Sequence, residues 1–123
     1  MSYDKPLVLV VEDKEWVCRS FSVRLEKFCR LLVAKTEAEA EKLFKDNVSG
    51  LDLIGMDACL SGKTPDTLML TQRIRADWRG PIITTSSDPS FNKKLMQCGA
   101  SYACEKSDFP EIAISVLDGL GKL

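Results

Sequence analysis

The stretch that decides the fold is LVLVVED, residues 7–13, in which five consecutive aliphatic residues are followed at once by two acids. A short aliphatic and β-branched run without polar alternation is typical of a strand covered on both faces. Strands of this kind belong mostly to parallel sheets, whose neighbouring strands are joined by crossover helices. The stretch therefore predicts an α/β sheet with an acidic edge where this strand ends.

Outward from this strand, short apolar runs alternate with longer amphipathic stretches along the whole chain. We expect further strands at 31–34, 51–56, 82–85 and 102–105. Helices should begin at about residue 14, run from the cap at Thr36 to about residue 46 and from 66 to 77, follow the turn at 86–89 as far as residue 98, and run from 108 to 120. Parallel strands with right-handed crossovers place helices on both faces of the sheet. The pattern predicts a three-layer α/β sandwich, and 123 residues are enough for one domain spanning 1–123.

Helical spacing also predicts which side chains are buried. The first helix should pack through Val17, Phe21, Leu25 and Phe28, and the last through Ile112, Val116 and Leu120. Thr36 and Glu39 have the spacing of a capping box, so a helix should begin just after Thr36. Trp16 lies one turn into the first helix, where its spacing predicts packing at the helix start.

Composition excludes several classes of function. Seventeen Lys and Arg against 18 Asp and Glu give no basic field, which argues against nucleic acid or a membrane as the main partner. The absence of His excludes imidazole catalysis and nucleophiles that need a His partner. Five Cys without a CxxC pair predict reduced packing residues. The polar start, 1–6, and the short apolar run after it do not resemble a signal peptide, so we expect a cytoplasmic protein.

Charged and hydroxyl side chains follow four of the five predicted strands. Glu12 and Asp13 follow the first, Asp57 the third, Ser86 the fourth and Lys106 the fifth. Carboxyl ends of parallel strands form the ligand-binding edge of such a sheet. Three carboxylates at one edge would repel one another unless a cation lay among them, and Mg²⁺ suits carboxylate ligands. Carboxylates, a hydroxyl, a lysine and a bound cation are the groups that phosphoryl transfer requires, because in that reaction the protein mainly positions groups and neutralises charge.

Each of these residues alone would be a helix cap or a surface residue, but their order along the chain is informative. The acid pair in VVED, the aspartate of DLIGMD, the hydroxyl in PIITTSS and the lysine of GASYACEK together resemble a response-regulator receiver domain of bacterial two-component signalling. The resemblance covers essentially the whole chain. It implies the flavodoxin-like, doubly wound (βα)5 fold with a parallel sheet of strand order 2-1-3-4-5.

The resemblance also implies a reaction and a cofactor. Asp57 would take a phosphoryl group from a phosphohistidine on a sensor histidine kinase or histidine phosphotransferase, and the chain itself would catalyse this transfer. Asp13 and Asp57 would bind Mg²⁺ directly, Glu12 would act through water, and the backbone carbonyl of Cys59 would complete the protein ligands.

Two further residues would carry the signal onward. By the same resemblance, Lys106 would pair with one phosphoryl oxygen, and Ser86 would move to hydrogen-bond another. The surface formed by the fourth helix, fifth strand and fifth helix would then change its affinity for a downstream protein target. Homodimers through this surface are common in the family, and the residues of this chain neither require nor exclude one.

Several positions depart from the family pattern. Ala103 stands where an aromatic residue usually lies, and Tyr102 is one position earlier, on the opposite face of a strand unless a bulge redirects it. Ser107 replaces the proline after the lysine, and a cis bond before a non-proline residue costs about 3 kcal/mol, which favours trans. Ser61 and Pro65 also differ from the residues that the family prefers in the loop after the acceptor.

Three alternative functions have some support in the sequence, and particular residues oppose each of them. The chain could be a receiver-like docking module that no longer accepts phosphate, which the altered positions favour and the retained chemical residues oppose. A flavin protein of similar topology would need a phosphate loop where Glu12 and Asp13 stand. The segment Ser61–Thr64, SGKT, resembles the end of a P-loop, but Asp57 replaces its first glycine and Pro65 interrupts the required helix.

Overall fold

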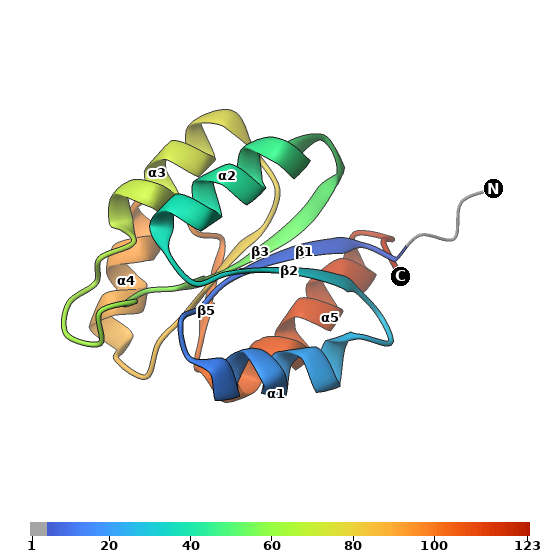
Figure 1. The fold of residues 1–123 in the computed structure, drawn as a ribbon, viewed down its shortest axis with the longest axis horizontal. Helices are drawn as coiled ribbons and strands as arrows, with labels where there is room; N and C mark the ends of the chain where they lie inside the picture. The colour runs from blue at the N-terminus through green and yellow to red at the C-terminus, as the bar shows by residue number, and fades with distance from the viewer. Residues whose placement is uncertain (1–4) are drawn as a thin grey trace.

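The computed structural model describes residues 5–123, so most of the polar start lies outside the described residues. Five parallel strands form one sheet in the order β2-β1-β3-β4-β5, which confirms the predicted fold class (Figure 1). The strands are β1 (Leu7–Val11), β2 (Arg30–Ala34), β3 (Leu51–Asp57), β4 (Ile82–Thr85) and β5 (Tyr102–Cys104). The helices are α1 (Glu15–Leu25), α2 (Glu37–Asn47), α3 (Leu68–Asp77), α4 (Pro89–Gln97) and α5 (Phe109–Gly119), with 3₁₀ turns at Val48–Gly50 and Lys106–Asp108.

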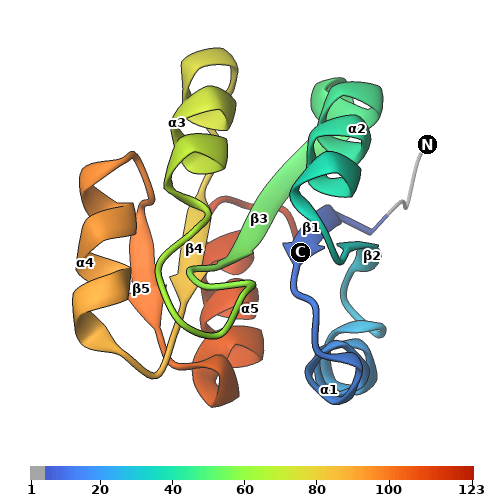
Figure 2. The same cartoon turned by 60° about the vertical axis from the view of Figure 1, so that its left-hand side comes forward.

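Helices cover both faces of the sheet, as a strand buried on both sides requires. α1 and α5 lie on one face, and α2, α3 and α4 lie on the other (Figures 1 and 2). Successive side chains of β1 alternate between two hydrophobic clusters: Leu9 joins the cluster under α2–α4, whereas Val8 and Val10 join the cluster under α1 and α5. The LVLVV run is therefore apolar throughout because neither face of β1 meets water.

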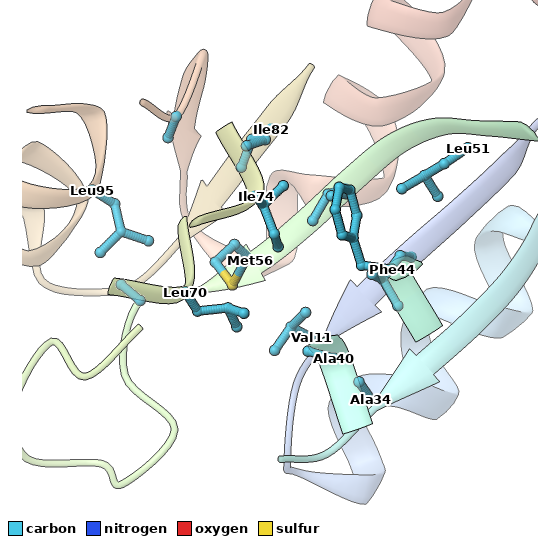
Figure 3. Close-up of a cluster of buried hydrophobic side chains, with 14 of the residues drawn as sticks. Val11, Ala34, Ala40, Phe44, Leu51, Met56, Leu70, Ile74, Ile82 and Leu95 are labelled. Atoms are coloured by element: carbon cyan, nitrogen blue, oxygen red, sulfur yellow. The ribbon is translucent and has the colours of Figure 1, made fainter. Parts of the chain in front are cut away.

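The larger cluster holds α2, α3 and α4 against the sheet (Figure 3). Met56, in β3, has a fully buried side chain in this cluster. Asp57 and Ala58 come directly after it in the sequence, at the edge of the sheet. Phe44 of α2 also packs edge-on against Trp78, with ring centroids 6.3 Å apart. Because Met56 precedes Asp57 directly, this packing fixes the end of β3 on which the acceptor candidate stands.

The structure agrees only partly with the predicted helix starts and with the side chains predicted to be buried on the helices. Thr36 caps α2 by accepting a hydrogen bond from Glu39 N, as the capping-box spacing predicts. The predicted burial of Phe28 and Leu120 is wrong: they are 41% and 53% exposed, because α1 ends at Leu25 and α5 at Gly119.

The buried stripe of α5 is displaced by one residue from the predicted one. Phe109, Ala113 and Leu117 are fully buried, whereas Ile112 and Val116 are only half-buried. The ring of Phe109 fixes this rotation of α5, because it packs against the backbone of Gly55 and against Phe21.

No helix among residues 5–123 is both long enough and apolar enough to cross a bilayer.

Candidate functional site

The carboxyl ends of β1 and β3 bring three acids together. Asp57 is the last residue of β3, and Glu12 and Asp13 follow β1 directly. One carboxylate oxygen from each of the three lies within 4.8 Å of the others. Glu12 and Asp57 are only 1% and 2% exposed, whereas Asp13 is exposed at the rim. The sheet therefore holds two carboxylates away from water and a third at the opening.

Lys106 faces the two buried carboxylates from the end of β5. Its Nζ lies 3.3 Å from Asp57 Oδ2 and 2.9 Å from Glu12 Oε1. The contact with Asp57 has hydrogen-bond geometry, whereas Glu12 Oε1 has no hydrogen-bond partner despite the short distance. The Glu12–Lys106 contact is an ion pair, because the ammonium nitrogen lies within salt-bridge distance of the carboxylate oxygen and can turn its hydrogens toward it. Glu12 Oε2 accepts from the backbone N of Lys14.

Burial shifts the acid–base properties of Asp57 and Lys106. Burial raises the pKa of Asp57 to about 6; the hydrogen bond from Cys59 N and the nearby Lys106 oppose this rise, and the charge of Glu12 adds to it. Burial alone would lower the pKa of Lys106, but Glu12 and Asp57 outweigh it and raise that pKa. Near neutral pH the site therefore contains an ionised, poorly hydrated Asp57 beside a cationic lysine.

The acidic cluster has the chemistry of a site for a hard divalent cation. Its three potential donors are all carboxylate oxygens, the ligand type that Mg²⁺ prefers. Lys106 is one cation facing three carboxylates, and its Nζ lies 2.9 Å from Glu12 Oε1 and 3.3 Å from Asp57 Oδ2. A divalent cation among the three acids would offset the repulsion that a single lysine leaves. The donor set thus fits the metal that the sequence predicts.

A cavity of about 130 Å³ opens onto Asp57. It is lined by Lys14, Asp57, Cys59, Gly62, Ser86, Ser87, Asp88, Phe91 and Lys106. The backbone N of Cys59 donates to Asp57 Oδ1 at 3.0 Å, and the orientation of the Cys59 carbonyl toward a metal stays a prediction. Ser86 Oγ accepts a hydrogen bond from Asp88 N, and Asp88 in turn caps α4 by accepting from Ser90 N. Ser86 and Lys106 thus line the same cavity as Asp57.

Sequence reasoning missed two residues that hold the loop after Asp57. The Asp66 carboxylate accepts hydrogen bonds from Leu60 N and Ser61 N at 2.7 and 2.8 Å. Burial would raise the pKa of Asp66, but these backbone bonds outweigh it and lower that pKa. Thr67 is fully buried and its hydroxyl donates to the Asp57 carbonyl oxygen. Because these side chains bond backward to the loop, α3 begins at Leu68 and the predicted start at Asp66 is wrong.

A buried asparagine on α4 was also missed. Asn92 Nδ2 donates to the carbonyl oxygens of Ser86 and Cys104, and its Oδ1 accepts from the Thr84 hydroxyl. Ser86 N donates to Cys104 O, so one side chain joins α4 to the ends of both β4 and β5. The sequence signal was weak, because a single Asn within an amphipathic helix is usually exposed.

The structure shows the backbone at the positions that differ from the usual receiver-domain residues. Pairing between β4 and β5 is regular, with Thr84 opposite Ala103, so no bulge redirects Tyr102, which is 45% exposed. Residues 5–123 contain no cis peptide bond, in agreement with the trans bond expected before Ser107. In the SGKT segment Gly62 adopts φ +84°, and the next helix begins only at Leu68, so the loop is not a P-loop.

Comparisons with known proteins agree on the fold. Neither a protein-family model nor a curated protein sequence matches the chain. A two-component response regulator from Clostridium difficile is 20% identical, with 96% of this chain and 98% of that chain covered and a TM-score of 0.79. A response regulator receiver protein from Pseudoalteromonas atlantica is 14% identical, with 94% and 99% covered and a TM-score of 0.79.

A further match comes from a eukaryotic complex. It is a chain of the co-crystal structure of a histidine phosphotransfer signaling protein of Saccharomyces cerevisiae with the receiver domain of its downstream response regulator. The identity is 19%, 100% of this chain and 95% of that chain are covered, and the TM-score is 0.75. At such identities the likeness concerns the fold, and it extends over almost the full length of both chains. The chain therefore has the fold of response-regulator receiver domains.

Proposed function

We propose that this chain is a phosphoacceptor switch, which takes a phosphoryl group from a partner phosphohistidine onto Asp57 and then changes its affinity for a downstream protein. One observation carries the proposal: the buried Asp57 carboxylate lies 3.3 Å from Lys106 and within 4.8 Å of two further acids, at the ligand-binding edge of the sheet. The donor would be a sensor histidine kinase or a histidine phosphotransferase, which supplies the imidazole that this sequence lacks.

The residues in the cavity divide the work of the transfer. Because the pKa of Asp57 is about 6, its carboxylate is ionised near neutral pH, and burial removes the water that would weaken it as a nucleophile. An Asp57 oxygen forms a bond to phosphorus while the donor N–P bond breaks, and its electron pair stays with the imidazole nitrogen. The Lys106 ammonium stabilises the charge on the phosphoryl oxygens.

The acidic cluster would hold Mg²⁺ for this reaction. Asp13 and Asp57 would be direct ligands, Glu12 would act through a water molecule, and the Cys59 carbonyl would complete the protein ligands. Bound Mg²⁺ supplies positive charge that offsets the phosphoryl oxygens. Asp13 suits an entry position, because it is exposed whereas Glu12 and Asp57 are buried.

Ser86 would convert the new charge into a change at the surface. Its side chain lines the Asp57 cavity, and its backbone is bonded to β5 through Cys104 O and to α4 through Asn92. Rotation of the Ser86 hydroxyl toward a phosphoryl oxygen would break the bond that it accepts from Asp88 N at the start of α4, and a shift of the Ser86 backbone with it would strain the bonds to β5 and α4. This would transmit the state of Asp57 to the surface formed by α4, β5 and α5.

Intact-mass measurement tests the proposal directly. The wild-type protein is incubated with phosphoramidate and Mg²⁺, beside Asp57→Asn and the matched control Asp77→Asn, whose carboxylate is exposed at the end of α3. We expect one added phosphoryl group in wild type and Asp77→Asn and none in Asp57→Asn. Hydroxylamine should remove it, because acyl phosphates react with hydroxylamine and phosphoserine does not. Unchanged mass in all three proteins would instead support the docking-module alternative.

A further inference from the structure

Trp16 is exposed, which contradicts its predicted packing at the start of α1. Its side chain is 70% exposed, although an indole normally buries a large apolar surface. The buried face of α1 is formed by Val17, Cys18, Phe21 and Leu25, and Trp16 points away from it. The packing of the helix therefore does not explain an aromatic side chain at this position.

The indole borders a hollow beside the Asp57 cavity. This hollow has a volume of about 350 Å³, within the range of small-ligand sites. It is lined by Lys14, Trp16, Ser87, Glu105, Lys106 and Ser107. Lys14, Ser87 and Lys106 also line the cavity that contains Asp57. The two spaces are thus neighbours that share a wall, and Trp16 belongs only to the outer one.

The sizes of the two spaces match the two parts of a phosphoryl donor. The inner cavity of about 130 Å³ has room for little more than a phosphoryl group beside Asp57. The leaving group must then remain outside, because attacking and leaving atoms lie on opposite sides of the phosphorus. A planar ring in the outer hollow would meet the exposed indole, and aromatic rings favour stacked or edge-to-face contact.

We propose that the Trp16 indole packs against the imidazole of the phosphodonor, so that the hollow beside Lys106 is a subsite for an aromatic leaving group. This inference rests on the proposed function, since it concerns the donor for Asp57. The N–P bond breaks as the Asp57 O–P bond forms. A ring protonated on its other nitrogen leaves as neutral imidazole, so no further acid is required.

Two small donors with the same type of bond isolate the contribution of the ring. N-phosphoimidazole and phosphoramidate both transfer phosphorus from nitrogen, but only the first carries an aromatic ring. In Trp16→Ala, the ratio of kcat/KM for phosphoimidazole to that for phosphoramidate should fall about 3- to 10-fold, the range for one aromatic contact. The loss should appear in KM, because the contact is made when the donor binds. Trp16→Phe should restore most of the ratio.

Val23→Ala is the matched control. Val23 is 74% exposed on the same helix, seven residues beyond Trp16, and does not border either space. We expect it to keep the wild-type ratio, with circular dichroism showing α1 intact in every variant. An unchanged ratio in Trp16→Ala, or an equal fall in Val23→Ala, overturns the subsite while phosphorylation of Asp57 stands. If neither donor labels the wild-type protein, the proposed function fails and the subsite fails with it.

Discussion

Lys106 Nζ lies 3.3 Å from Asp57 Oδ2 at the bottom of a site whose two deepest carboxylates are almost inaccessible to water. The same ammonium is 2.9 Å from Glu12, so a single cation faces two buried anions. The site costs folding free energy at Asp57, because the nearby lysine and backbone hydrogen bond do not fully offset the burial of that carboxylate. The raised pKa of Asp57 is the local sign of that cost.

We first predict that Asp57→Asn stabilises the protein at neutral pH and not in acid. The pKa of the carboxyl is 3.8 unfolded and about 6 folded, so folding favours its protonated form. The protonated carboxyl of Asp57 therefore stabilises the folded state relative to the ionised one. This stabilisation is fully present below pH 3.8 and is lost as pH rises through about 6. This loss corresponds to about 3 kcal/mol of unfolding free energy above pH ~7, which an uncharged Asn avoids.

Urea denaturation across the pH range measures this difference. The two proteins should converge in stability as the pH falls toward 3.8, where the wild-type carboxyl is protonated in both states. Asp77→Asn, at an exposed position, should remain close to wild type throughout. Equal unfolding free energies of wild type and Asp57→Asn at neutral pH would show that Lys106 fully compensates the buried charge.

The second prediction concerns metal binding. Mg²⁺ should raise the unfolding free energy of the wild-type protein, by about 2.7 kcal/mol when present at about 100 times its dissociation constant. Asp13→Asn should weaken this effect without disturbing the core, because Asp13 is the exposed member of the acidic cluster. Calorimetric melting with and without EDTA gives the measurement.

Tryptophan fluorescence gives an independent measurement of the same binding. Trp16 borders a hollow that shares Lys14 and Lys106 with the Asp57 cavity, so a cation there should change its emission. Trp16→Phe should abolish the change, because Trp78 packs against Phe44 under α2. A titration identical in wild type and Trp16→Phe would place the responding group or the ion elsewhere.

A structural feature could be predicted from the sequence when the residues that form it lie close together along the chain or follow a regular pattern. The strand Leu7–Val11 and the acids after it were readable because burial on both faces requires an unbroken apolar run. The cap at Thr36 was readable because its partner is three residues away. The roles of Asp66 and Asn92 could not be predicted. Asp66 bonds to backbone groups five and six residues earlier in an irregular loop, and Asn92 bonds to Cys104, twelve residues away beyond the end of its helix, so no local spacing rule identifies these partners.

The third prediction separates Asn92 from its neighbour Thr84. Asn92→Ala removes three hydrogen bonds, to Ser86 O, Cys104 O and the Thr84 hydroxyl, although Cys104 O still accepts from Ser86 N, and the change should lower the unfolding free energy by about 2–4 kcal/mol. Thr84→Val removes only one of these bonds and should cost about 1 kcal/mol. Urea denaturation with an unchanged m-value would give both numbers. Equal losses would mean that the bonds to Ser86 and Cys104 contribute nothing to stability.

The last prediction tests the packing that aligns Lys106 with Asp57. A Cβ at Gly55 would lie 2.5 Å from Cζ of Phe109, whose fully buried ring is also 4.8 Å from that of Phe21, centroid to centroid. Because the ring has no free space, Gly55→Ala should cost about 1–3 kcal/mol of stability.

The same clash should also disturb the site, since Gly55 lies two residues before Asp57 and Phe109 three residues after Lys106. We therefore expect Gly55→Ala to slow phosphorylation by phosphoramidate as well. Phe109→Leu in the Gly55→Ala background should recover part of both losses, giving a coupling free energy of about 1 kcal/mol or more in a double-mutant cycle. Strict additivity would show that the strand bends away from the ring instead. In that case, the contact between β3 and α5 does not set the distance from Lys106 to Asp57.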